Sequence, residues 1–376
     1  MIYLDAASTT AVRPDVVQAM WPYLTGEFGN PSSVHELGTS ADRALRDARA
    51  AVAAWLGARP SEIVFTSGGT EADNLAIKGI ALAAPRGRHI VISAIEHPAV
   101  AEACEQLARL HGFQITTLPV DQDGRVDPAA FRLAIRADTT LASIMFANNE
   151  IGTVQPIAEL AASARELGVP FHTDAVQAAG AFDLDVRALG VDALSLSGHK
   201  LGAPKGIGAL FVRGRLPVEP LISGGGQERG KRSGTENVAF AVGLAAAVKH
   251  RTGTSVAELA ARRDRFIAEV LDTVPGAILT GSRTDRLPGH ASFCFPGTGG
   301  ESVLLELERH GILSSSGSAC AAGATEPSPV LLALGIDPEV AHTAVRFTFD
   351  DDISDDQLQE AAVALRAAIN SLHAVA

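Results

Sequence analysis

Several residue types are scarce in this sequence, and each shortage excludes a class of protein. Only three of the 376 residues are cysteines, Cys104, Cys294 and Cys320. So few cysteines, and an odd number, do not make a disulfide framework and are typical of a reducing compartment. Basic residues are outnumbered, with 31 lysines and arginines against 43 aspartates and glutamates and a net charge of −12. We therefore expect no direct nucleic-acid binding and no attraction to an anionic membrane.

Long hydrophobic runs are also missing. The longest uncharged apolar run, Val238 to Val248, is too short to cross a bilayer. The first residues, Met1 to Asp5, lack the basic and then apolar layout of a signal peptide. Hydrophobic residues nevertheless make up 47% of the chain, which is enough to bury a large core. The composition thus predicts a globular protein of the cytoplasm with no membrane association.

Apolar runs rich in β-branched residues alternate with segments of helical spacing. Predicted strands cover Ile63–Thr66, His89–Ser93, Phe113–Pro119, Leu141–Ala147, Pro170–Asp174 and Ala193–Ser197. Predicted helices cover Glu71–Ala84, Pro98–His111, Asp127–Arg136 and Pro156–Leu167. Nearly all-apolar strands joined by helices indicate an α/β fold with a mostly parallel sheet covered by helices. Such sheets bind ligands beyond the carboxyl ends of their strands.

The pattern changes near Val256, and the length of 376 residues also favours two domains. Predicted helices then cover Ala257–Thr273, Glu301–His310 and Asp355–Ala374, with short strands near Ile278 and at Ser292–Phe295. We interpret this part as a second, smaller α+β domain.

Polar or glycine-rich segments follow several of the predicted strands. Ser67–Glu71 joins a strand to a helix, so either it binds a single phosphate, with Gly69 and Thr70 at the helix start, or it is a tight turn capped by Thr70. His172 and Asp174 lie on one face of a strand end. Three interpretations are open. The two residues could be metal ligands, or Asp174 could hydrogen-bond a ring nitrogen of a cofactor with Gln177 nearby. The third is that the strand end is simply solvated.

Lys200 follows another strand, in Ser197–Lys200, where a neutral lysine amine suits Schiff-base chemistry and Ser197 and His199 could donate to a phosphate. The alternative is an ordinary surface lysine. A phosphate-binding helix start, the strand-end Asp174 and Lys200 together form the set that holds pyridoxal 5'-phosphate. His97, also after a strand, could stack on the ring and move protons, or could have no role beyond the helix start.

One cysteine lies among small residues, in Ser314–Gly323. Few side chains there can bury apolar area, so we expect an exposed loop on which Cys320 is a nucleophile rather than a structural thiol. Cys104 and Cys294 have neighbours typical of core positions.

These motifs together resemble the pyridoxal-phosphate-dependent cysteine desulfurases. The similar segments are Ser67–Leu75, Asn148–Gly152, His172–Gln177, Ser197–Lys200, Arg232–Thr235 and Ser315–Cys320, in order along nearly the whole chain. The loop around Cys320 is similar to the NifS/IscS-like group rather than to the SufS-like group. One departure is that Arg346 is followed by Phe347–Asp350 where the family usually has Ser-x-Gly.

The resemblance implies a role for each matching residue. Lys200 would form the internal aldimine, Asp174 would pair with the pyridine nitrogen, Gln177 would contact the ring hydroxyl and His97 would stack on the ring. The cofactor phosphate would be bound by Thr70, Ser197 and His199 beside Gly69, and by Thr235 from the other subunit of a homodimer. Asn149 and Arg346 would hold the substrate carboxylate, a task that suits a bidentate guanidinium.

The implied reaction converts L-cysteine to L-alanine, with the sulfur carried on Cys320 as a persulfide and passed to a sulfur-acceptor protein for iron–sulfur cluster assembly or another thio-modification. The implied fold is the aspartate-aminotransferase type I fold, with a seven-stranded sheet in the large domain. Residues 14–255 would form that domain, and residues 1–13 and 256–376 the small one, with the cysteine loop at about 313–328.

Other functions stay open at the level of the sequence. A selenocysteine lyase or another pyridoxal-phosphate β-eliminating enzyme would need the same cofactor residues but not Cys320. A metal-dependent hydrolase would use His172, Asp174 and His199, although Lys200 beside them would repel a cation, and no metal is expected. A non-enzymatic sulfur carrier would have no need of Lys200.

Overall fold

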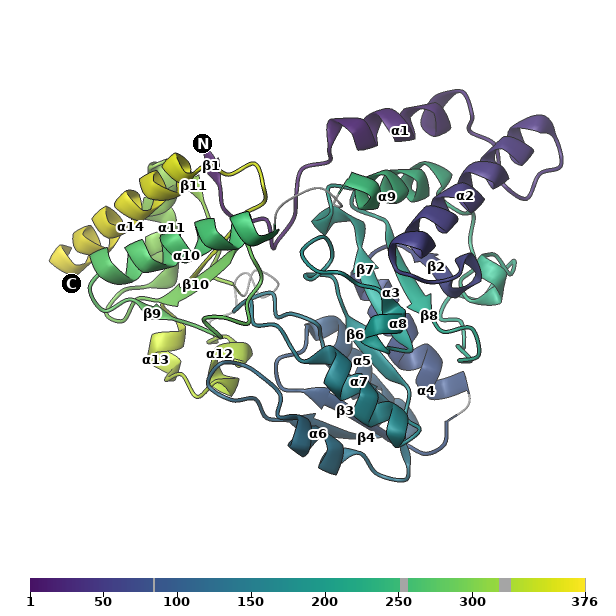
Figure 1. Ribbon diagram of the computed structural model, residues 1–376, viewed down its shortest axis with the longest axis horizontal. Helices are drawn as coiled ribbons and strands as arrows, with labels where there is room; N and C mark the ends of the chain where they lie inside the picture. The colour runs from purple at the N-terminus through teal and green to yellow at the C-terminus, as the bar shows by residue number, and fades with distance from the viewer. Residues whose placement is uncertain (84, 251–255, 318–325, 376) are drawn as a thin grey trace.

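The computed structural model of the protein describes residues 1–83, 85–250, 256–317 and 326–375 and shows two lobes (Figure 1). The large lobe contains a seven-stranded sheet with the order β2-β8-β7-β6-β5-β3-β4. Its strands are β2 (Ile63–Thr66), β3 (His89–Ser93), β4 (Gln114–Leu118), β5 (Thr139–Ser143), β6 (Phe171–Asp174), β7 (Ala193–Ser197) and β8 (Gly208–Val212). β8 runs antiparallel to both of its neighbours, whereas the other neighbouring strands are parallel.

Helices cover both faces of this sheet. Successive strand residues face opposite sides and are apolar on both, so both sides must be buried. One hydrophobic core joins Phe171 and Leu194 to the helices α2 (Glu36–Trp55), α7 (Ile157–Glu166) and α9 (Val238–His250). The other joins Ile90 and Ala193 to the helical run α3 (Gly69–Asn74), a π-helical turn at Leu75–Gly79 and α4 (Ile80–Ala83), and to α5 (Pro98–His111). The remaining helices of this lobe are α1 (Pro14–Thr25), α6 (Pro128–Ala134) and α8 (Val186–Leu189).

The small lobe is built around a three-stranded antiparallel sheet of the order β12-β10-β9. Its elements are β9 (Ile278–Leu279), β10 (His290–Cys294), β12 (Ala344–Thr348), α10 (Val256–Thr273), α11 (Gly300–Arg309) and α14 (Asp355–Val375), with α12 (Pro329–Ala333) and α13 (Pro338–Ala341) beside them. Phe347 and Phe349 pack against Phe266 with ring centroids 5.4 and 6.4 Å apart. The departure after Arg346 therefore places two aromatic rings in the core of this lobe and keeps a regular strand.

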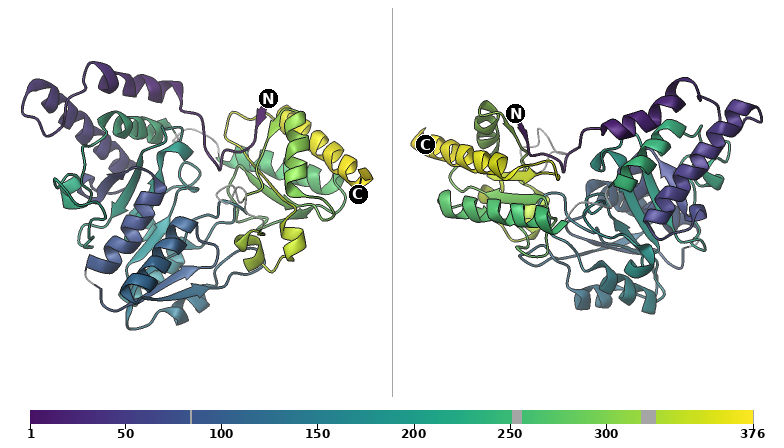
Figure 2. Two further views of the ribbon diagram at one scale, coloured as in Figure 1. Left: turned by 180° about the vertical axis from the view of Figure 1, so that it is seen from behind. Right: turned by 45° about the horizontal axis from the view of Figure 1, so that its top comes forward.

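The N-terminal residues cross from the small lobe to the large one (Figures 1 and 2). β1 (Ile2–Tyr3) pairs in parallel with β11 (Ile312–Leu313), and Leu4 is buried in the small-lobe core. We call residues 5–10, which follow, the strap. On these observations we propose the division into residues 14–255 and residues 1–13 with 256–376.

The structure differs from the sequence-based prediction in several elements. The strand predicted over Leu141–Ala147 begins and ends earlier, at Thr139–Ser143, because the chain leaves the sheet at its carboxyl edge to form the cavity wall. β1, β8, β11 and β12 were not predicted; β8 begins at a glycine, and the two-residue strands have no recognisable period. Within the described part of the chain, no helix is both long and apolar enough to cross a membrane.

A buried ion pair anchors the glycine-rich segment 223–234 to the sheet. Arg49 donates to both carboxylate oxygens of Glu228, at 2.6 and 2.8 Å, and to the carbonyl of Ile63 at 2.9 Å. The same carboxylate accepts the Phe65 amide at 3.2 Å. Glu228 and Arg229 have positive φ angles of 50 and 58°, which are unfavourable for side-chain-bearing residues. The ion pair therefore stabilises a strained backbone.

We predict that Glu228→Gln destabilises the protein strongly. The substitution leaves the Arg49 charge buried without a counter-charge, which lowers the free energy of unfolding by about 3 kcal/mol. Urea unfolding followed by circular dichroism measures this change. Asp138→Asn is the matched control, because it breaks the exposed Arg136–Asp138 pair and should leave the unfolding midpoint unchanged. Equal midpoints for the two variants would contradict the anchoring role of the buried pair.

Candidate active site

A cavity of about 380 Å³ lies at the carboxyl edge of the parallel strands. It is lined by most residues predicted to bind cofactor and substrate, namely Gly69, Thr70, His97, Asn149, Asp174, Gln177, Ser197, His199, Lys200 and Arg346. Thr235 does not line this cavity and is exposed. Cys320 lies outside the residues that the structure describes.

The start of α3 forms one end of the cavity. A Cβ on Gly69 would lie 2.8 Å from Val176 Cγ2 and 3.3 Å from Ser197 Cβ, so a glycine is needed for this close approach. The helix is preceded by Gly68 and has no side-chain cap, so the alternative in which Thr70 only caps the helix does not hold. The backbone amides of this helix start thus remain available to an anion.

His97 occupies the N-cap of α5, directly before Pro98. Its Nδ1 accepts a hydrogen bond from the Ala99 amide at 3.1 Å. Because Nδ1 is an acceptor, the neutral imidazole carries its proton on Nε2. The residue therefore has both a structural role at the helix start and a ring that lines the cavity.

A buried polar layer lies beneath the cavity on β5, β6 and β7. The two ring nitrogens of His172 bond the hydroxyls of Ser143 at 2.8 Å and Ser195 at 2.9 Å. Burial lowers the pKa of His172 to about 3, so the ring is neutral. Asp174 reaches the cavity, and its Oδ1 accepts the Val176 amide at 2.9 Å. His172 has both nitrogens engaged and does not line the cavity, which removes a ligand from the proposed metal hydrolase site.

Two further buried carboxyl groups lie close to Asp174. Burial raises the pKa of Glu96 to about 8; its Oε1 accepts the Ser93 hydroxyl at 2.5 Å and its Oε2 has no partner. Burial and the neighbouring Asp174 raise the pKa of Asp73 well above its usual range. Asp174 itself has a pKa raised by burial, against the lowering effects of His97 and Lys200. This end of the cavity is therefore poised to favour a positive charge or a proton.

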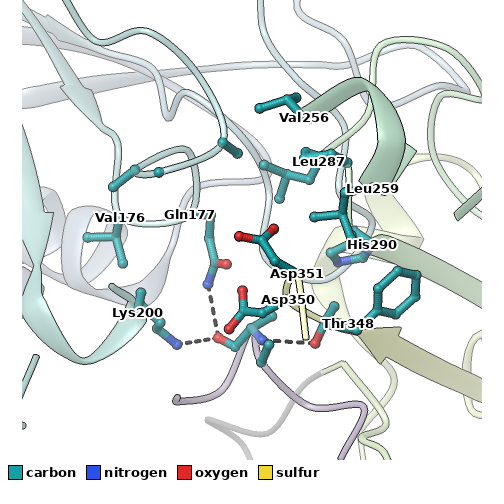
Figure 3. A pocket seen from close by; sticks show the side chains of 18 residues that line it. Val176, Gln177, Lys200, Val256, Leu259, Leu287, His290, Thr348, Asp350 and Asp351 are labelled. Carbon is teal, nitrogen blue, oxygen red and sulfur yellow. Dashed lines mark hydrogen bonds between the residues drawn. The ribbon is translucent and has the colours of Figure 1, made fainter. Parts of the chain in front are cut away.

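Lys200 and Gln177 both donate to the strap. The Lys200 amine donates to the carbonyl of Ser8 at 2.7 Å. It also donates to the carbonyl of Ala7, which accepts Gln177 Nε2 at 3.1 Å as well (Figure 3). Ala7 separates the main cavity from a second one of about 70 Å³, which Figure 3 shows and whose walls share Val176, Gln177 and Lys200.

His199, beside Lys200, is neutral in this setting. Burial, together with the charges of Lys200 and Lys205, lowers the pKa of His199 to about 4. Its Nδ1 lies 3.2 Å from the Thr9 hydroxyl. The imidazole can therefore act as a hydrogen-bond donor or acceptor without adding charge to the cavity.

Arg346 enters the cavity from the small lobe because of the strand period. Val345 and Phe347 on β12 face the core of that lobe, so Arg346 between them faces the large lobe. Its Nη1 donates to the carbonyl of Asn149 at 2.9 Å, and its side chain is 2% exposed. A guanidinium and the Asn149 residue thus lie together in the cavity, as expected for a carboxylate site.

The residues present fit pyridoxal phosphate. The cavity offers an amine, a strand-end carboxylate, an imidazole and hydroxyl groups beside a glycine-shaped helix start. Asp73 Oδ1 is buried without a partner and lies 3.8 Å from His172 Nε2, so the floor of the cavity still has acceptor capacity. The groups that line the cavity are therefore complementary to a ring that carries a cationic nitrogen and a phosphate.

Sequence reasoning missed several residues of this site. Ala7 and Ser8 line the cavity, as does Asp73. The strap residues are almost 200 positions from Lys200 along the chain, and no local pattern indicates that they meet. The acidic Asp73 within a helix reads as a solvent-facing residue, although it is 1% exposed.

The chain belongs to the class-V aminotransferase family, which matches residues 2–360. Its fold is that of the pyridoxal-phosphate-dependent aminotransferases, and the family depends on this cofactor. The sequence-based prediction of fold and cofactor is thereby confirmed.

Its relatives point to one activity. The chain is 48% identical over 351 residues to "Cysteine desulfurase IscS" of Dictyoglomus turgidum, covering 92% of this chain and 89% of the relative. A solved "NifS-like protein" matches 99% of this chain and 100% of its own length with a TM-score of 0.91 and 33% identity. A structure described as "SspA in complex with cysteine" matches 93% of this chain and 99% of its own length with a TM-score of 0.83 and 37% identity.

We predict that Glu96 makes the protein less stable as the pH rises. The folded carboxyl keeps its proton up to a pH of about 8, whereas the unfolded one loses it near 4.5. Unfolding therefore releases a proton between these values, and the free energy of unfolding falls by up to about 1.4 kcal/mol per pH unit.

Urea unfolding of the parent and of Glu96→Gln at pH 5, 6, 7 and 8 measures this effect. Glutamine resembles the protonated acid, so the variant should gain stability relative to the parent at each higher pH. Asp73 and Asp174 are present in both proteins. A difference that stays constant from pH 5 to 8 would show that Glu96 ionises normally.

Proposed function

We propose that this chain is a cysteine desulfurase that converts L-cysteine to L-alanine and transfers the sulfur to Cys320. The observation that carries this proposal is the gathering of Lys200, Asp174, His97 and Arg346 around one cavity. The relatives named cysteine desulfurase, and the neighbour described as a complex with cysteine, support the same substrate.

The chain's residues divide the work of binding and orienting the cofactor. Lys200 would hold it covalently, Asp174 would pair with its ring nitrogen, and Gln177 would contact its ring hydroxyl. Thr70, Ser197 and His199 would bind the phosphate beside Gly69. When bound, pyridoxal phosphate supplies the electron sink that weakens the bonds of an attached amino acid. The buried carboxylate at the ring end would keep the ring nitrogen protonated.

The substrate would be oriented by its carboxylate. Arg346 and Asn149 both line the cavity, and a guanidinium is able to bind a carboxylate through two hydrogen bonds. His97 lines the same cavity, so its imidazole is placed to move a proton close to the substrate.

Cys320 would be the sulfur acceptor. Gly317, three residues before it, lines the cavity, so the chain leading to Cys320 passes the site. The Cys320 thiolate would attack the substrate sulfur, forming an S–S bond while the carbon–sulfur bond breaks. The electron pair stays on carbon, which takes up a proton to give alanine. The persulfide would then pass to an acceptor protein for iron–sulfur cluster assembly or another thio-modification.

We predict that Cys320→Ser abolishes persulfide formation with L-cysteine but keeps the bound cofactor. Serine lacks the nucleophilic sulfur, whereas none of the proposed cofactor contacts is changed. Mass spectrometry after alkylation measures the persulfide, and absorbance measures the cofactor.

Lys200→Ala is the complementary variant, because it should lose the cofactor that borohydride fixes to the parent chain. Sulfide release from L-cysteine at the parent rate by Cys320→Ser would remove the nucleophile assignment and favour a β-eliminating enzyme. A colourless parent protein that binds zinc would contradict the whole proposal.

A second copy of the chain is the expected partner. Apolar side chains are exposed on α1 and on the connection to α2, which project from the large lobe (Figure 1). Trp21 is 62% exposed and Phe28 68%, with Leu24 and Val34 beside them in the chain. Such a concentration of exposed apolar residues is typical of a protein interface. Thr235, exposed and away from its own cavity, would then reach the cavity of the other subunit.

We predict that the double variant Trp21→Ser, Phe28→Ser weakens the homodimer by at least tenfold in dissociation constant, on the order of 1.4 kcal/mol or more. The reason is the loss of two large apolar contacts. Light scattering after size exclusion measures the mass. Leu133→Ser is the control, since Leu133 is even more exposed, at 86%, but lies on α6. An unchanged dimer in the double variant would place the interface elsewhere.

The compartment is proposed to be the cytoplasm. Cys104 and Cys294 are buried free thiols, and burial raises the pKa of these thiols to about 12 and about 11. Both are therefore inert core residues, and this part of the chain is suited to a reducing environment.

A further inference from the structure

The guanidinium of Arg346 has little donor capacity left for an incoming ligand. Its Nη1 donates to the carbonyl oxygens of Asn149 at 2.9 Å and Gly317 at 3.2 Å. Its Nη2 donates to Asp5 Oδ1 and to Ser8 Oγ, both at 2.8 Å. A guanidinium has two hydrogens on each Nη and one on Nε. All four Nη hydrogens are therefore engaged, and Nε has no partner but is shielded from solvent.

Asp5 also balances the charge of this arginine. Among the described residues, Arg346 forms an ion pair with Asp5, at 2.8 Å. The nearby carboxylate of Glu150 instead accepts the hydroxyl of Ser328 at 2.5 Å. A carboxylate that binds to Arg346 must therefore displace a hydrogen bond, and it meets a guanidinium that is already neutralised by a partner.

We propose that Asp5 is an internal competitor for the substrate carboxylate, which replaces it on Nη2 of Arg346 and so sets the affinity for the substrate. This inference rests on the assignment of Arg346 to the substrate carboxylate. One carboxylate exchanges for another, so the charge on the guanidinium stays balanced throughout.

Asp5 is easier to release from Arg346 than the backbone carbonyl of Asn149 is. Its side chain is 20% exposed, so the freed carboxylate regains water. The Asn149 carbonyl is shared with His290 Nε2 at 3.2 Å and belongs to the backbone. A backbone carbonyl is fixed by the chain on both sides and cannot turn away as a side chain can.

The exchange needs only a side-chain rotation. The backbone on either side of Asp5 is fixed to β12, because Leu4 O accepts the Thr348 amide at 2.8 Å and the Ala6 amide donates to Thr348 O at 3.0 Å. The strap can therefore stay in place, with its bonds to β12, while the Asp5 carboxylate turns away.

Binding of propionate to the holoenzyme tests the competition, because propionate has the carboxylate but neither the amine nor the thiol of the substrate. In Asp5→Asn, the propionate dissociation constant should fall on the order of tenfold, measured by isothermal titration calorimetry. Propionamide, which lacks the charge, should bind parent and variant alike. Asp138→Asn removes another arginine-paired carboxylate far along the chain and should leave propionate binding unchanged.

Tighter binding is a result that damage to the fold would not produce. Asp5→Ala provides a second variant with the same expected direction, and the KM for L-cysteine should fall in both. Unchanged or weaker propionate binding in both variants would overturn the competition and make Asp5 a residue that positions Arg346.

Two outcomes distinguish an error in the Asp5 competition from an error in the proposed reaction. If propionate binds unchanged in the variants while the parent forms alanine from L-cysteine, only the competition is wrong. If propionate binds more tightly in the variants but the parent forms no alanine, the reaction is wrong and the competition for Arg346 stands.

Discussion

The hydrogen bonds that hold the strap across the carboxyl edge of the large sheet are the constraint on which the site depends. Lys200 and Gln177 donate to the strap from the large lobe, and the Thr348 hydroxyl accepts the Ala7 amide from the small lobe at 2.8 Å. Neither lobe alone forms the cavity, since Lys200 comes from one and Arg346 from the other. A segment fixed to both lobes therefore sets the distance between the cofactor residues and the carboxylate site.

Beneath the cavity, burial controls protonation more than neighbouring charge does. His172 is neutral because it is buried, and its two serine partners use both nitrogens without adding charge. Glu96 and Asp73 keep their protons for the same reason. Because the groups around it are neutral when buried, Asp174 can respond to a cationic ring.

Much of this site could be predicted from the sequence because its residues follow strands. Asp174 ends β6, and His97 and Lys200 follow β3 and β7. These are parallel strands of one sheet, and parallel strands end at one edge. The glycine segment could be predicted because it joins a strand to a helix, and the fold class because strands and helices alternate. The resemblance, rather than any spacing, supplied Asn149 and Arg346, since a strand residue such as Arg346 gives no local sign of facing another lobe.

What could not be predicted arises from contacts between distant segments. Asp5 and Arg346 are 341 positions apart, and their ion pair exists only once β1 has paired with β11 and the strap has met β12. Burial is equally invisible in the sequence, so the raised pKa of Glu96 could not be predicted.

The strap also explains how one arginine can serve both structure and binding. Without a ligand, Arg346 joins the strap to β12 through Asp5 and Ser8, and its buried charge is balanced. An arginine left unpaired in this position would be strongly unfavourable, because a buried charge needs a partner. A carboxylate that is partly in water meets that need and can still be exchanged. The same ion pair that stabilises the empty site therefore limits how tightly a substrate carboxylate is held there.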